Sequence, residues 1–190
     1  MCLGQGGNYN GLFQATAAAV LSGMGELSRV GHVITPEYGL MQRIHIAVTD
    51  LPLAPGKPID FGLMKFCRVC KKCADYCPAR ALSSDTEPTW DMQDKPYRGT
   101  GVKRWLLEEP RCVSYYRTVG NCTTCFGVCP YSHRSKAAWN TFMRSTVSLN
   151  PSMDRFFRKA DDFFYGSGIR TGEEIDDIWN RVDLPPWGYV

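Results

Sequence analysis

The sequence lacks the features that mark membrane-spanning, secreted and nucleic-acid-binding proteins. Its longest weakly apolar stretch, residues 15–25, is shorter than the roughly 18 residues of a membrane-spanning helix and consists mainly of small side chains. No charged segment is followed by a hydrophobic one, as in a secretory signal peptide. The net charge is only +3, and like charges form no long block. Two explanations stay open: a cytoplasmic protein, or the back part of a longer precursor, which the loop-like opening residues favour.

Composition and patterning indicate an ordinary globular protein that is rich in helix. The chain has 190 residues, of which 44% are apolar and 22% are charged, as in soluble domains. Alternating polarity and β-branched residues predict a strand at residues 43–49, after an extended segment at 31–39. Prolines and glycines predict a connector at 51–62. Helix formers and capping residues predict helices at 14–29, 134–149, 150–166 and 171–182.

Nine cysteines are the strongest signal, and eight of them fall into two blocks. The blocks are Cys67, Cys70, Cys73 and Cys77, followed by Pro78, and Cys112, Cys122, Cys125 and Cys129, followed by Pro130. Closely spaced cysteines can hold one face of an iron–sulfur cube, while the cysteine before a proline ligates the other cluster. The spacing therefore predicts two [4Fe–4S] clusters that exchange their fourth ligands. Group A comprises Cys67, Cys70, Cys73 and Cys129, and group B comprises Cys77, Cys112, Cys122 and Cys125.

Zinc and disulfides are the alternatives to clusters, and the spacing fits both poorly. Zinc sites usually combine two separated Cys-x2-Cys pairs, often with histidine. The odd number of cysteines argues against a framework of disulfides alone, and Cys2 reads as an incidental thiol. A basic group beside the first block is either a solvated helix face or charge compensation for an anionic cluster. It comprises Lys65, Arg68, Lys71 and Lys72.

The segment upstream of the cysteines resembles a known family. The residues GELSR (25–29), ITPEYG (34–39), Arg43 and TDLPL (49–53) precede the two cysteine blocks in that order. In this combination they resemble the corrinoid-dependent reductive dehalogenases, over most of residues 11–150. Members of that family are several hundred residues long, so the resemblance implies that this chain is the C-terminal part of one.

The resemblance implies an α+β fold in three parts. Residues 1–60 would be the C-terminal part of a nitroreductase-like corrinoid-binding core. Residues 61–133 would form a ferredoxin-like domain with two [4Fe–4S] clusters, and residues 134–190 a helical C-terminal extension. A base-off cobalamin would lie between the core and the ferredoxin-like domain. The group A cluster would be the proximal one, which reduces cobalt to Co(I).

The implied reaction is the reductive dehalogenation of an organohalide, in which a carbon–hydrogen bond replaces a carbon–halogen bond. Arg43 stands where the family has a cationic residue near the substrate, and there it would stabilise developing negative charge. A surface arginine at the start of a strand is the alternative. The family's proton-donating tyrosine is expected upstream of this chain. Tyr9 is the candidate within it, with a loop residue that only hydrogen-bonds as the alternative.

Further residues are candidates for contacts with the corrinoid. Tyr38 would line the cofactor or belong to the core, and His45 reads as a structural histidine. Ser114, Cys122 and Thr123 would approach the corrinoid tail where the group A cluster meets the cofactor. No histidine belongs to the Asp-x-His-x-x-Gly motif that places an imidazole under cobalt, which agrees with a corrinoid without a protein lower ligand. The histidines are His32, His45 and His133.

Two other functions stay open at this point. Epoxyqueuosine reductases share the corrinoid and the two clusters but act on tRNA. They would bring a basic surface and often a helical repeat, whereas the tail here shows no repeat and is partly acidic, so no nucleic acid is expected as a partner. The acidic residues are Glu173, Glu174, Asp176 and Asp177. A stand-alone two-cluster electron carrier would leave residues 25–53 without a role.

The resemblance also implies a cellular setting for the parent enzyme. Family precedent places such an enzyme on the outer face of the cell membrane, as a peripheral protein of organohalide respiration. Its partners would be a small membrane anchor protein and an electron donor.

Overall fold

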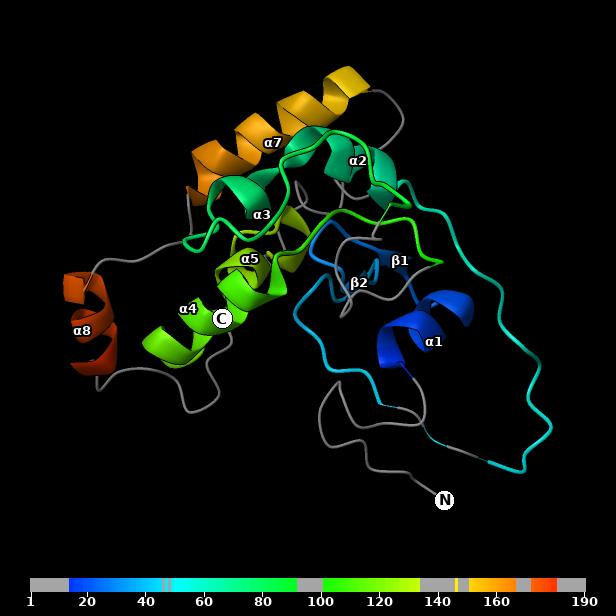
Figure 1. Ribbon diagram of the computed structural model, residues 1–190. Helices are drawn as coiled ribbons and strands as arrows, with labels where there is room; N and C mark the ends of the chain where they lie inside the picture. Colours follow the sequence, from blue (N-terminus) through cyan, green and yellow to red (C-terminus); the bar gives the residue numbers. More distant parts are fainter. Residues whose placement is uncertain are drawn as a thin grey trace.

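Helices form most of the regular structure, and a two-stranded antiparallel sheet accompanies them (Figure 1). The computed structural model describes residues 14–45, 47, 49–91, 101–133, 146, 151–166 and 172–180. The sheet pairs β1 (Glu26–Leu27) with β2 (Val33–Ile34). The helical elements are α1 (Ala15–Leu21), α2 (Leu63–Cys70), α3 (Lys72–Asp75), α4 (Glu109–Val119), α5 (Thr124–Gly127), η1 (Pro130–Ser132), α7 (Pro151–Tyr165) and α8 (Gly172–Asn180). This mixture agrees with the expected α+β class.

The helix predicted at 14–29 is half as long as expected. It ends at Leu21, and the chain turns through Gly23, which has a positive φ of 80°. A Cβ atom on Gly25 would lie 2.1 Å from the Ile34 carbonyl oxygen. These glycines therefore serve a turn and a close approach of two strands, and the GELSR residues form the start of a hairpin and no helical turn.

The strand predicted at 43–49 is wrong for the part that the structure describes. Residues 43–45 have no regular structure, and Ala47 makes only an isolated bridge, while residues 46 and 48 lie outside the described residues. The extended segment at 31–39 is confirmed in part. It contains β2, while residues 36–38 form a turn that the bridge between Thr35 and Gly39 closes. The connector at 51–62 is confirmed too, because it has no helix or strand.

The hydrophobic core lies between the hairpin, α2 and α7. Helix α7 packs along α2, although the two are far apart in sequence (Figure 1). Leu63 and Phe66 of α2 are buried against Phe157 of α7 and Tyr131 of η1. The Phe66 and Tyr131 rings meet edge to face, with centroids 5.6 Å apart, a favourable aromatic geometry. This core fixes the first cysteine block against the end of the second.

The C-terminal helices match the sequence predictions where the structure describes them. Helix α7 covers the predicted 150–166 and is followed by Gly166, whose φ is +58°, as at many helix C-termini. Helix α8 covers most of 171–182. The predicted helix at 134–149 lies outside the described residues except for position 146. Within the described segments, no helix combines the length and the apolarity needed to cross a membrane.

Gly39, in the ITPEYG motif, allows the hairpin to approach the second cysteine block. Its φ is +63°, and an added Cβ would lie 1.9 Å from the Tyr131 carbonyl oxygen. Gly120 has a similar φ of +65° but nothing within 4 Å. Gly39→Ala and Gly120→Ala should both cost about 1–2 kcal/mol for the left-handed backbone, and Gly39→Ala should cost about 1–3 kcal/mol more for the collision. Urea unfolding of both variants measures the difference, and equal losses would contradict the close approach.

Candidate metal centres

The four group A thiols come together at the junction of α2, α3 and η1. Cys67 and Cys70 lie in α2, Cys73 in α3, and Cys129 directly before η1. All four line one cavity, together with Arg29. The pKa of Cys73 is raised first by burial and then by the negative charges of the other three thiolates. Residues from both blocks therefore share one site, as the spacing predicts.

The group B thiols form a second cluster of side chains. Cys112 lies in α4 and Cys125 in α5, which packs against α3. Burial raises the pKa of Cys125 to about 12, and repulsion from Cys112, Cys122 and Cys77 adds to the effect. Cys77, from the first block, thus lies with three cysteines of the second. The structure brings the eight cysteines together in the predicted crosswise grouping, and their role as ligands stays a prediction.

Burial keeps the group A thiols protonated in the absence of metal. It raises the pKa of Cys67 to about 11 and that of Cys129 to about 12, and the pKa of Cys70 rises further. A metal cluster must displace these protons, so its binding is coupled to deprotonation. Backbone N–H groups of Lys72 and Tyr131 already donate to the Cys70 and Cys129 sulfurs and favour the thiolate form.

The arrangement differs from a disulfide framework and from a single-ion site. The eight cysteines that the structure describes are free thiols. Among the described residues, no three side chains of the metal-binding types converge on one ion. Zinc would require sulfurs about 3.8 Å apart, since each lies about 2.3 Å from the ion. Four thiols that share a site without converging on one point suit a cube, because each sulfur binds a different iron.

Arg29 is the principal residue of the group A site that the sequence reading missed. Its side chain is 1% exposed. The Nε and Nη2 atoms donate to the Cys67 carbonyl oxygen at 3.2 and 2.7 Å, and Nη1 donates to the carbonyls of Ser83 and Asp85 at 2.7 and 2.8 Å. The guanidinium also lies 4.4 Å from the Trp105 ring centroid, a cation–π contact. Arg29 therefore fastens the last turn of α2 to residues after the first block.

Glu26 gives the GELSR motif a second role in the same site. Its Oε2 atom accepts hydrogen bonds from the backbone N–H groups of Phe61 and Leu63, at 2.8 and 3.0 Å. A carboxylate at the N-terminus of α2 satisfies free N–H groups and interacts favourably with the helix dipole. Glu26 and Arg29 thus hold opposite ends of the helix that carries Cys67 and Cys70.

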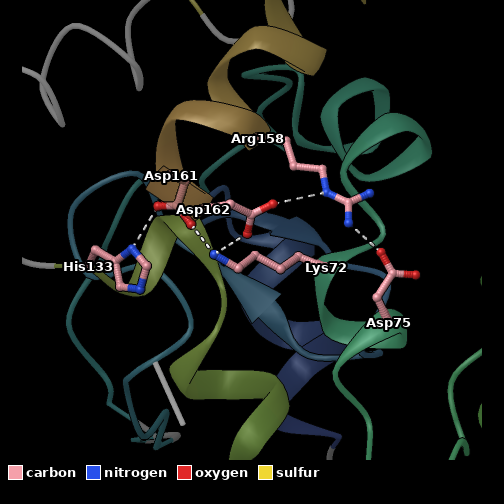
Figure 2. Close-up of polar contacts among 6 residues, drawn as sticks. All are labelled: Lys72, Asp75, His133, Arg158, Asp161 and Asp162. Atoms are coloured by element: carbon pink, nitrogen blue, oxygen red, sulfur yellow. Dashed lines mark hydrogen bonds and ion pairs between the residues drawn. The ribbon is translucent and has the colours of Figure 1, made fainter. Parts of the chain in front are cut away.

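The basic group beside the first block divides into surface and buried residues. Arg68 pairs with Glu87 at 3.0 Å, and Lys71 bonds the Thr86 hydroxyl at 3.0 Å, both at the surface. Lys72 is wholly buried, and its Nζ atom lies 2.6 Å from Asp161 Oδ2 and 2.9 Å from Asp162 Oδ1 (Figure 2). Its charge is therefore paired with carboxylates of α7, so a solvated helix face does not describe it.

Helix α7 is tied to both cysteine blocks by this polar network. Asp161 also meets His133 Nδ1 at 2.8 Å, four residues after Cys129, and Arg158 pairs with Asp75 in α3 (Figure 2). Burial alone would lower the pKa of Lys72, but the hydrogen bonds that its ammonium group donates to the Asp161 and Asp162 carboxylates raise the pKa overall. Helix α7, which falls within the predicted extension, is therefore part of the structure that supports group A.

Lys72→Met is expected to destabilise the chain strongly. It leaves the buried carboxylate of Asp161 without its ammonium partner, and breaking a buried pair in this way costs about 3–5 kcal/mol. Arg158→Met is the matched control, because the pair with Asp75 is partly exposed and such pairs contribute about 1 kcal/mol or less. Urea denaturation measures both variants. Equal and small losses would show that the buried pair does not hold α7.

A second cavity, of about 470 Å³, adjoins group B. Its polar lining includes His32, Gln42, Arg43, His45 and Tyr116, and its apolar lining includes Phe126. Tyr116 lies one helical turn after Cys112 in α4, and Phe126 directly follows Cys125 in α5. Arg43 is exposed there. Arg43 therefore lines the same cavity as residues of α4 and α5, the helices that contain Cys112 and Cys125.

His32 forms part of the wall between this cavity and the second block. Its ring lies 5.2 Å from the Phe126 ring, and burial lowers its pKa. A neutral imidazole packed on an aromatic ring agrees with a structural histidine.

The remaining candidates lie elsewhere or outside the description. Tyr38 is 53% exposed, and its N–H bonds the Thr35 hydroxyl at 3.1 Å. It is not a core residue within this chain. Ser114 and Thr123 are exposed beside the group B cysteines. Tyr9 and Cys2 lie outside the described residues.

Comparisons with known proteins bear on both parts of the site. Residues 66–132 match the family model of a 4Fe–4S double cluster binding domain. The chain is 36% identical over 180 residues to a trichloroethene reductive dehalogenase of Dehalococcoides mccartyi, which covers 92% of this chain and 30% of that protein. It is 34% identical over 194 residues to a tetrachloroethene reductive dehalogenase of Dehalobacter restrictus, with 93% and 34% covered.

A solved structure and a more distant relative complete the comparison. A solved structure of a reductive dehalogenase, whose description refers to a mechanism for B12-dependent dehalogenation, superimposes with a TM-score of 0.68 at 26% identity. The match covers 80% of this chain and 21% of that one. An epoxyqueuosine reductase of Lactococcus garvieae is 27% identical over 154 residues. The chain spans about a third of the length of the curated dehalogenases that it matches.

Proposed function

Because this chain belongs to the reductive dehalogenase family, we propose that it is the electron-delivering part of an enzyme that removes halogen from an organic substrate. The observation that carries the proposal is the crosswise grouping of the eight cysteines inside the double-cluster domain. Group A would hold one [4Fe–4S] cluster and group B the other. A chain that only carried electrons would not need the Arg43 cavity beside group B.

The residues present fit two anionic clusters. A cube with four thiolate ligands carries net negative charge. The buried guanidinium of Arg29, which has no carboxylate partner among the described residues, already lines the group A cavity. Backbone N–H groups point at the sulfurs of both groups, including that of Ala81, which donates to Cys77 Sγ at 3.3 Å. Such hydrogen bonds stabilise thiolate ligands.

The second cavity fits one wall of a corrinoid and substrate site. Replacing a carbon–halogen bond by a carbon–hydrogen bond takes two electrons and one proton and releases halide. Bound clusters would supply the two electrons one at a time, and a bound corrinoid would supply the cobalt chemistry. Arg43 would place its guanidinium where negative charge develops on the departing halide and stabilise it. Phe126 and Tyr116 would exclude water from that wall. Tyr38, Ser114 and Thr123 stay candidates for contacts with the corrinoid.

The order of the two clusters is proposed to be the reverse of the one expected from the resemblance. Group B, through Tyr116 and Phe126, borders the cavity that Arg43 lines. Group A lies against Arg29 and is braced by α7 through the neighbouring Lys72. If Arg43 marks the substrate side, the group B cluster is the proximal one, and electrons enter through group A.

The parent enzyme's other properties are part of the proposal. A nitroreductase-like core would contribute residues 1–60 and the remaining walls of the corrinoid site. Residues 61–133 would be the cluster domain and 134–190 the extension that supports it. The parent would act on an organohalide, receive electrons from a separate donor, and sit on the outer face of the membrane with an anchor protein.

The test is anaerobic turnover by the parent protein reconstituted with iron, sulfide and cobalamin. Release of halide from chlorinated ethenes or halogenated phenols, in proportion to reductant consumed, is the expected result. An epoxyqueuosine reductase is the second candidate, supported by the 27% identical relative. Conversion of epoxyqueuosine in tRNA without halide release would favour it and overturn the dehalogenase.

A further inference from the structure

Arg29 carries a buried positive charge that forms no ion pair with a carboxylate in the described part of the chain. Its hydrogen-bond partners are three backbone carbonyls, which are neutral. The ion pairs found among the described residues include none with Arg29. The Asp85 carboxylate, whose residue supplies one of those carbonyls, bonds the Ser83 hydroxyl at 2.6 Å instead. A buried guanidinium in this state is costly unless an anion lies nearby.

Lys72, the other fully buried cation in the described part of the chain, is in a different electrostatic state. Two carboxylates of α7 lie within 2.9 Å of its ammonium group, and its pKa is raised overall. The pKa of Arg29 is lowered by burial, and negative charge on Cys73, Cys67, Cys70 and Asp85 opposes this lowering. Both residues adjoin group A, but only the charge of Arg29 is unpaired. Lys71 also lines the cavity, and its ammonium group lies at the surface, where it donates to the Thr86 hydroxyl. Arg29 is therefore the buried cation that is left for an anion in the cavity.

We propose that Arg29 is the built-in countercharge of the group A cluster and sets its reduction potential. The cavity that the four thiols and Arg29 share places the guanidinium beside the added electron. One-electron reduction makes the cluster more negative by one charge, and a fixed neighbouring cation favours that state. Arginine stays protonated throughout, so no proton accompanies the electron. Hydrogen bonds to backbone carbonyls hold the guanidinium in place. One of these carbonyls belongs to Cys67, in the helix α2 that also contains Cys70.

Group B provides an internal reference for this effect. The pKa values of Cys112 and Cys125 are raised by burial and by neighbouring negative charge, and no cation in the described part of the chain lowers them. Among the described residues, both fully buried cations lie at group A. A change at Arg29 should therefore move the potential of one cluster and leave the other where it was.

The experiment is a redox titration of the parent protein with both clusters loaded. Dithionite is the reductant, dyes act as mediators, and EPR measures the reduced form of each cluster. In Arg29→Gln, the reduced-to-oxidised ratio of the group A cluster at fixed ambient potential should fall at least tenfold, which is about 59 mV for one electron. Arg29→Lys keeps the charge and should change the ratio less than threefold. The group B signal, identified by its loss in Cys112→Ala, should not move. Lys72→Met tests whether removal of any buried cation has the same effect. Because the Lys72 charge is already paired, this variant should change the reduced-to-oxidised ratio of the group A cluster less than Arg29→Gln does.

Each outcome decides the inference, which rests on the proposed double-cluster function. An unchanged group A potential in Arg29→Gln at full iron content would overturn it, and so would an equal shift in Arg29→Lys, because the effect would then be one of geometry. If Arg29→Gln loses its group A iron, the group A potential of Arg29→Lys decides the inference. Loss of group A iron in both variants would assign Arg29 to folding only and overturn the inference. A wild-type parent without clusters would instead refute the proposed function.

Discussion

Replacing Cys77 by alanine is expected to remove the cluster that belongs mainly to the second cysteine block. Cys77 stands in the first block, but its thiol lies with Cys112, Cys122 and Cys125. Loss of one thiolate leaves a cube with an open iron site. The variant should therefore fall from about eight to about four iron atoms per parent chain, while the cluster of Cys67, Cys70 and Cys73 stays intact. Iron and sulfide analysis with EPR measures this directly.

Cys129→Ala is the matched control, since the two residues have mirrored places in their blocks. It should remove the group A cluster and leave group B. The informative comparison is between the EPR signals lost in variants of the same cysteine group. Cys77→Ala should lose the same EPR signal as Cys112→Ala, and Cys129→Ala the same signal as Cys70→Ala. If Cys77→Ala instead lost the signal that Cys70→Ala loses, each block would bind its own cluster and the crosswise assignment would be wrong.

Replacing Arg43 by alanine is expected to abolish most of the dehalogenation without disturbing the clusters. The side chain lines the cavity beside group B and takes no part in either cysteine group. Removing a cation that stabilises developing negative charge costs about 10²–10³-fold in kcat. Arg43→Lys keeps the charge but not the planar geometry of the guanidinium, so it should recover part of the rate. Halide release under saturating substrate measures kcat for each variant.

Arg155→Ala is a suitable control for this experiment, because Arg155 is an exposed arginine of α7. It changes the net charge by the same amount and should leave kcat unchanged. Iron content and EPR signals must be equal in all three variants for the comparison to hold. An Arg43→Ala enzyme with wild-type kcat would assign Arg43 to the surface, which is the alternative that the sequence leaves open.

The cysteine groups could be predicted from sequence because cluster ligation depends on short intervals between cysteines. The short intervals from Cys67 to Cys77 and the prolines after each block constrain how the chain can wrap a cube. Arg29 could not be found in this way. Its partners Cys67, Ser83 and Asp85 lie 38, 54 and 56 residues further along the chain. One arginine in a short polar motif gives no local signal that it will be buried.

The errors in secondary structure have a similar cause. Alanine and leucine favour a helix through residues 14–21, but Gly23 and Gly25 serve long-range contacts, with Lys57 and Ile34 respectively. The pairing of β1 with β2 then replaces the second half of the expected helix. Residues 43–45 alternate in polarity without a strand to pair with in the described structure. Tertiary contacts decide both cases, and propensity is only a weak prior against them.

The basic residues near the first block illustrate what spacing alone cannot separate. Lys65, Arg68, Lys71 and Lys72 look alike in sequence, yet only Lys72 is buried. Its burial depends on Asp161 and Asp162, some ninety residues later. The buried, unpaired cation at the group A cavity is Arg29, outside the group that the sequence indicated, and charge compensation by it is the inference proposed above.

The measurement that tests the central claim most directly is the metal content of the anaerobically reconstituted parent protein, determined together with EPR of its reduced form. Two clusters and a corrinoid predict about eight iron and eight sulfide per chain, cobalt close to one equivalent, and spin-coupled signals from two [4Fe–4S] centres. Iron without cobalt would restrict the protein to electron transfer. Zinc bound in place of iron, with no EPR signal on reduction, would contradict the account.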